Sequence, residues 1–121
     1  MTGPTPSPTP SPGQALVAAG WAVRVLDLGG AEDKAALMDR CARVLELPDW
    51  FGRNWDALAD SLGDPGVGPK AAHGLVLVVT GWQEFAERRP GDWETAREVL
   101  AEAVERRRGD DAALTVVLGL S

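Results

Sequence analysis

The chain has 121 residues, of which 45% are hydrophobic and 25% are charged, so it is long enough for one domain with a buried core. Eighteen acidic residues against twelve basic residues give a formal net charge of −6, which disfavours nucleic-acid binding because phosphates require concentrated Lys and Arg. A single cysteine excludes an intrachain disulfide, and with no visible membrane span or secretory leader we expect a cytoplasmic protein.

The chain begins with a segment rich in proline. Residues 2–13, TGPTPSPTPSPG, predict an extended, solvated tail because they offer nothing apolar to bury; a proline-rich docking peptide is the alternative. We therefore expect residues 1–13 to form a disordered tail and residues 14–121 to form the folded domain. Residues 21–30, WAVRVLDLGG, alternate in polarity and end in two glycines, which predicts a strand followed by a turn.

The next predicted element is a helix over residues 31–47. Its apolar positions at helical spacing are Leu37, Cys41, Val44 and Leu45. Glu32 and Asp33 are expected in its first turn, where the helix dipole favours acids, and Pro48 helps to end it.

The second half of the chain alternates between strands and helices. Residues 75–79, LVLVV, form the continuous apolar run expected of a buried parallel strand, and residues 82–88 predict a short helix. A longer helix is expected from a cap at Asp92 through Arg108, with Gly109 ending it and a last strand over residues 113–120. Its predicted inward-facing residues are Trp93, Ala96, Val99, Leu100, Ala103 and Val104. The alternation predicts an α/β fold with a small parallel sheet covered by helices.

Residues 47–64, LPDWFGRNWDALADSLGD, combine large aromatic residues with acids. Asn54 is expected to cap a helix that runs to about residue 62. The apolar stripe predicted to face the core consists of Phe51, Trp55, Leu58 and Leu62. Asp56 and Asp60 then project outward with Arg53, while Trp50 precedes the helix. An exposed Trp beside paired acids is typical of a protein–protein interface.

Evidence for catalysis or metal binding is weaker. His73 alone cannot form a zinc site and is expected in solvent, and Cys41 is expected to be a buried structural thiol. The sequence GDPGVGPK matches a phosphate-binding loop poorly, and Ser61 has no obvious histidine partner. Acid–base catalysis by Asp56 and Asp60 is the remaining enzymatic hypothesis. Carboxylates on one convex helix do not face each other across a cleft, as acid–base catalysis of this kind requires. We therefore expect that the chain is not an enzyme, and we also expect that it binds no cofactor or metal.

The same segment resembles the signature of the barstar family, the intracellular protein inhibitors of small secreted ribonucleases. The matching residues are Leu47, Pro48, Asp49, Trp50, Phe51, Gly52, Asn54, Asp56, Ala57, Leu58, Asp60 and Leu62. The order of elements agrees from about residue 21 to the C-terminus, and the tail is not covered. The resemblance implies a three-stranded parallel sheet covered by helices, in which an acidic helix and the preceding loop block the active site of the ribonuclease.

The resemblance also implies which residues bind the partner. The two motif aspartates carry over to Asp56 and Asp60, and the loop aromatic carries over to Trp50. Backbone contacts carry over to Gly52 and Asn54. An acid of the long C-terminal helix is aligned less securely, to Glu102. The implied partner is a small basic ribonuclease bound 1:1, without direct nucleic-acid or membrane binding.

Three residues within or beside the motif affect the choice of partner. The family's best-known member has Trp just before the second aspartate, where this chain has Ala59. Arg53 adds a positive charge, and its spacing allows a surface pair with Asp56 or with an acid of the target. Asp64 is the last of four acids that, with one base, give residues 49–64 a net charge of −3 (4 − 1 = 3). Two alternatives therefore stay open: immunity to a delivered toxin nuclease, and a barstar-like interaction module without inhibition.

Overall fold

The computed structural model describes residues 12–49, 51–64, 66, 68–69, 71–109 and 112–119. Its elements, in chain order, are α1 (Pro12–Ala18), β1 (Trp21–Asp27), α2 (Lys34–Val44), α3 (Trp55–Gly63), β2 (Gly74–Thr80), α4 (Trp82–Arg88), α5 (Pro90–Arg106) and β3 (Ala113–Leu118). Most of the predicted tail, residues 1–11, lies outside the described residues. Helix α1 was not predicted from the sequence, and it takes in Pro12 and Gly13. Proline suits the first turn of a helix because its missing N–H has no intrahelical partner there.

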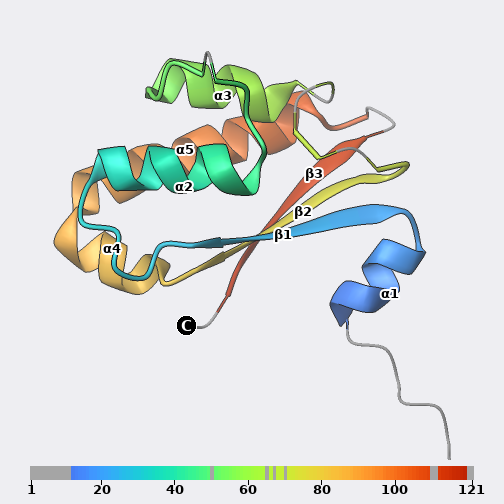
Figure 1. Cartoon of the computed structure of the whole chain (residues 1–121), viewed down its shortest axis with the longest axis horizontal. Helices are drawn as coiled ribbons and strands as arrows, with labels where there is room; N and C mark the ends of the chain where they lie inside the picture. Colours follow the sequence, from blue (N-terminus) through green and yellow to red (C-terminus); the bar gives the residue numbers. More distant parts are fainter. Residues whose placement is uncertain are drawn as a thin grey trace, which may run out of the picture.

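The three strands form one parallel sheet in the order β1-β2-β3, so β2 is central. Connections between parallel strands are right-handed, and two successive connections in the same direction place their helices on the same face. Accordingly α2, α3 and α5 lie on one side of the sheet, while α1 lies on the other side beside the start of β1 (Figure 1). The predicted α/β fold with a small parallel sheet is confirmed.

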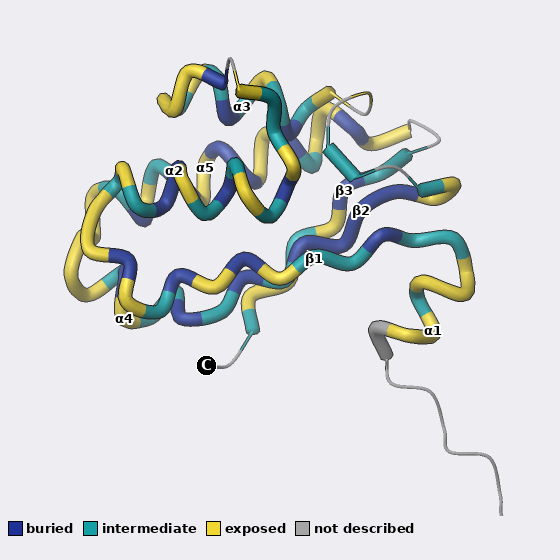
Figure 2. Tube along the Cα trace, viewed as in Figure 1, coloured by how far each residue is buried: buried dark blue, intermediate teal, exposed yellow. Residues whose placement is uncertain are grey.

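The core lies between the sheet and these helices (Figure 2). Leu75, Leu77 and Val79 of β2 are buried on one face, while Val76 on the other face is also buried and Val78 is half-buried, which explains why this strand is a continuous apolar run. The opposite face of the sheet is more open, since Val25 of β1 and Val117 of β3 are exposed.

Helix α3 packs against α5 and forms an outer layer of the molecule (Figure 1). Its predicted apolar stripe is confirmed, since Phe51, Leu58 and Leu62 are buried and Trp55 packs partly buried against them. Because this stripe faces inward, the opposite row of α3 side chains faces solvent.

Several helix ends differ from the predictions. Asp33 is the N-cap of α2 and not part of its first turn, and its carboxylate accepts a hydrogen bond from the Ala36 N–H at 2.9 Å. Helix α5 begins at Pro90, so Asp92 lies within the first turn and does not cap the helix. Both differences are shifts of a few residues, which capping patterns alone do not resolve.

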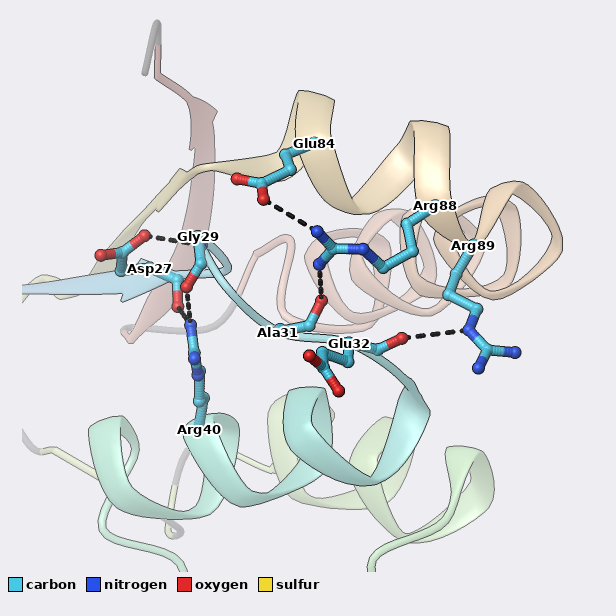
Figure 3. Close-up of polar contacts among 8 residues, drawn as sticks. All are labelled: Asp27, Gly29, Ala31, Glu32, Arg40, Glu84, Arg88 and Arg89. Carbon is cyan, nitrogen blue, oxygen red and sulfur yellow. Dashed lines mark hydrogen bonds and ion pairs between the residues drawn. The ribbon is translucent and has the colours of Figure 1, made fainter.

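The loop from β1 to α2 is held by an arginine clamp, formed by Arg40, Arg88 and Arg89 (Figure 3). The acceptors are the carbonyls of Asp27 and Gly29 for Arg40, of Ala31 for Arg88 and of Glu32 for Arg89, at 2.6–3.0 Å. Backbone carbonyls that lie at the end of a strand or outside regular helices and strands need other hydrogen-bond donors, and these three arginine side chains supply them. The clamp thereby fixes how the chain passes from the sheet into α2.

Close backbone packing completes this end of the sheet. Gly81 links β2 to α4 with a φ of +67°, and a Cβ at this position would lie 2.3 Å from the Gly29 nitrogen. Glycine is therefore required at residue 81 for both its conformation and its lack of a side chain.

Candidate protein-binding site

The start of α3 is fixed by the predicted cap. The Asn54 side-chain oxygen accepts a hydrogen bond from the Ala57 N–H at 2.7 Å, while its amide nitrogen donates to the Gly52 carbonyl at 3.3 Å. Gly52 and Asn54 are both exposed, so this turn is accessible to a partner. Trp50, the predicted aromatic contact, lies outside the described residues.

Asp56 and Asp60 form an exposed row on α3, as their spacing predicts. Asp56 lies in the first turn, where the positive end of the helix dipole favours a carboxylate. Its carboxylate has no hydrogen-bond or ion-pair partner among the described residues. It is therefore available to a cationic group of another molecule.

Arg53 does not pair with Asp56, contrary to one prediction from the sequence. Its Nε donates to the Asp39 carboxylate of α2 at 2.8 Å. Arg53 also adopts a φ of +50°, in the left-handed region that side chains other than glycine rarely occupy. Its charge is thus directed toward α2, and Asp56 is left uncompensated.

Glu102 of α5 is brought close to Asp60 through an arginine that the sequence analysis did not assign to the site. Arg106 of α5 places Nη1 3.7 Å from Asp60 Oδ1 and Nη2 3.8 Å from Glu102 Oε1. The three side chains are 79% (Asp60), 61% (Glu102) and 45% (Arg106) exposed. We call Asp56, Asp60 and Glu102 the acidic face. In the sequence, the local signal for a contact between Glu102 and Arg106 is their four-residue spacing.

Arg106 and its neighbour Arg107 also bind the end of α3. Arg106 Nη1 donates to the Ala59 carbonyl at 3.3 Å, and Arg107 Nη1 donates to the Leu62 carbonyl at 3.2 Å. Helix α3 has no basic residue in its own last turn, so α5 supplies the cations that its carboxyl end favours. Arg107 is buried and also donates to the Ala112 carbonyl, at 3.0 Å.

The remaining predicted contacts lie along the same helix. Ala59 is half-buried, so the surface next to Asp60 has no aromatic ring at this position. Asp64 ends α3, is exposed, and accepts a hydrogen bond from the Gly66 N–H at 2.8 Å. The structure therefore places Gly52, Asn54 and Asp64 at the two ends of the helix that carries Asp56 and Asp60.

The other candidate residues lie elsewhere. Cys41 is buried, and this desolvation raises the pKa of its thiol to about 12, as expected of a structural cysteine. His73 is exposed and lies near the Trp21 ring, at a centroid distance of 6.3 Å. No group of three potential metal-binding His, Cys, Asp or Glu residues occurs in the described part of the chain. None of the helices described there has the length and apolarity to cross a membrane.

Comparison with known proteins relates the chain to one family. The family model described as Barstar (barnase inhibitor) matches residues 21–119, which is most of the chain and includes the acidic face. The match begins after α1 and leaves out the proline-rich N-terminal segment. A comparison with curated proteins gave no match.

Proposed function

The chain belongs to the barstar family, and from that premise we propose that it inhibits a small basic ribonuclease of the barnase type. It binds one ribonuclease molecule, with α3 and the loop before it covering the active site. The chain itself performs no catalysis in this proposal. An inhibitor that protects its producer acts where the ribonuclease is made, so the proposed location is the cytoplasm.

The observation that carries this proposal is the exposure of Asp56 and Asp60 on a helix whose other side is locked into the core. Their carboxylates lie on a helix held at its start by Asn54 and at its end by arginines of α5. A rigid support of this kind presents charges without a large entropic cost on binding. Carboxylates on such a support can occupy the positions that RNA phosphates take in a basic active site.

The electrostatics of the segment favour the same kind of partner. Residues 49–64 carry a net charge of −3, and Arg53 is turned toward Asp39. An acidic surface is steered toward a basic cleft, and the association rate falls as salt screens the charges. Barnase and barstar are themselves the standard illustration of this effect.

An RNA-cleavage assay with barnase tests the proposal. Increasing amounts of the protein should abolish cleavage at one equivalent, and the complex should run as a 1:1 species in size-exclusion chromatography. Barnase activity that stays unchanged at a large excess of the protein would contradict inhibition of a barnase-type enzyme.

A second candidate function is binding to a basic protein without inhibition. The contact of Arg106 with Asp60 favours it, because this cation partly neutralises an acid that would enter the active site. The same assay separates the two candidates. If the protein binds without inhibiting, its complex with barnase should still cleave RNA. Immunity to a delivered toxin nuclease involves the same surface and differs in the identity of the nuclease.

A further inference from the structure

We infer that Arg106 is a built-in counter-ion that competes with the target's cation for Asp60 and Glu102, and so limits which basic partners bind. This inference rests on the proposed function, because it concerns the same acidic face. Arg106 has the position for this role, since one guanidinium approaches an acid of α3 and an acid of α5 at the same time.

The contacts of Arg106 differ in strength. Its separations of 3.7 and 3.8 Å from the two carboxylates are longer than charge-assisted hydrogen bonds, which are about 2.7–2.9 Å. Its hydrogen bond to the Ala59 carbonyl is shorter, at 3.3 Å. The carboxylates can therefore exchange Arg106 for another cation while Arg106 stays attached to the backbone of α3.

The stem of Arg106 has a separate structural role. It lies against Gly63, where an added Cβ would come within 2.8 Å of the Arg106 Cδ. Substitutions can thus distinguish the packing of the aliphatic part of Arg106 from the effect of its charge. Arg106→Met keeps an unbranched apolar stem and removes the charge, whereas Arg106→Lys keeps both a stem and a charge.

Arg97 offers a matched control on the same helix. It is nine residues from Arg106, which corresponds to about half a turn in direction, and it pairs with Glu94 at 3.5 Å. Arg97→Met and Arg106→Met each change the formal net charge from −6 to −7 (−6 − 1 = −7), so both alter long-range steering by the same amount. A difference between the two variants then reports the local competition.

The test measures barnase binding by stopped-flow fluorescence at low and high salt. At low salt Arg106→Met should bind about fivefold more tightly than Arg97→Met, because a unit charge at about 4 Å in water contributes about that factor. The extra affinity of Arg106→Met should appear as slower dissociation and should shrink at high salt. Loss of packing by the Arg106 stem would instead weaken binding at every salt concentration. Arg106→Lys should stay within about twofold of the native protein, as expected when the charge is retained.

Three results would overturn the inference. They are equal affinities of the Arg106→Met and Arg97→Met proteins, weaker binding by Arg106→Met at unchanged melting temperature, and a gain by Arg106→Lys as large as that by Arg106→Met. The difference between the Met variants should also shrink when Asp60→Asn is added to both, because one of the two carboxylates for which Arg106 competes is then uncharged.

An oligoarginine peptide, with affinity measured by calorimetry at low salt, separates this inference from the proposed function. If barnase is not bound by the native protein, the proposed function fails, but Arg106→Met should still bind the peptide more tightly than Arg97→Met. Equal peptide affinities, or no peptide binding by any variant, would overturn the competition even if barnase is inhibited.

Discussion

In the arginine clamp, three guanidinium groups donate to backbone carbonyls at 2.6–3.0 Å, whereas on the acidic face Arg106 lies 3.7 and 3.8 Å from two exposed carboxylates. The carbonyls belong to the last residue of β1 and to the loop that leads into α2, where backbone acceptors need hydrogen-bond donors. The carboxylates face solvent and can change partners. The same residue type therefore fixes the fold at one site and, in our proposal, adjusts binding at the other.

The largest expected effect separates the two regions by function. Asp60→Ala should weaken binding to barnase by about 2–5 kcal/mol, because it leaves cationic groups of the partner desolvated and unpaired. The side chain is 79% exposed, so the free energy of unfolding should change by no more than about 0.5 kcal/mol. Titration calorimetry and urea denaturation measure the two quantities. Glu94→Ala, about two turns before Glu102 on α5, is the charge-matched control, and an equal loss of affinity in it would contradict a specific role for Asp60.

Substitutions of glycine at the two regions should differ in how much they lower the free energy of unfolding. Gly81→Ala should lower the free energy of unfolding by about 2–4 kcal/mol, because it combines a left-handed backbone with overpacking against Gly29. Gly52→Ala should cost less than about 1 kcal/mol, since Gly52 is exposed and its nearest neighbour would be the Asn54 side-chain nitrogen at 3.1 Å. Urea denaturation of both variants checks this, and equal losses would show that the clamp end is no more constrained than the binding end.

Removing an arginine of the clamp should destabilise the fold. Arg40→Met leaves the Asp27 and Gly29 carbonyls without this donor and should lower the free energy of unfolding by about 2 kcal/mol. Arg43→Met on the same helix is the control, because the exposed Arg43 side chain has no hydrogen-bond or ion-pair partner among the described residues. Thermal melts compare the two, and similar melting temperatures would show that the clamp adds little stability.

The smallest effect is expected at the pair of Arg53 with Asp39. Both side chains are more than half exposed, so a double-mutant cycle with Arg53→Met and Asp39→Asn should give a coupling of about 0–1 kcal/mol in unfolding. A coupling above about 2 kcal/mol would show that this pair stabilises the fold as the arginine clamp does, unlike the contacts of Arg106 on the acidic face.

The main features of this fold could be predicted from the sequence because their causes are local. The apolar run of β2, the stripe of α3 and the cap at Asn54 depend on residues within one or two helical turns or on alternation along one strand. The outward direction of Asp56 and Asp60 follows from the same periodicity. The short helix α1 was not predicted, because its proline and glycine are also typical of an extended tail.

Only the tertiary structure decided which charges meet. Arg53 pairs with Asp39 because the loop before α3 passes beside α2, and Arg106 approaches Asp60 because α3 packs against α5; no local pattern fixes either arrangement. Arg107 is buried for the same reason, since the ends of α3 and α5 meet around it. Sequence periodicity thus determined which side chains face outward, whereas the packing of helices distant in sequence determined how strongly each outward charge is compensated.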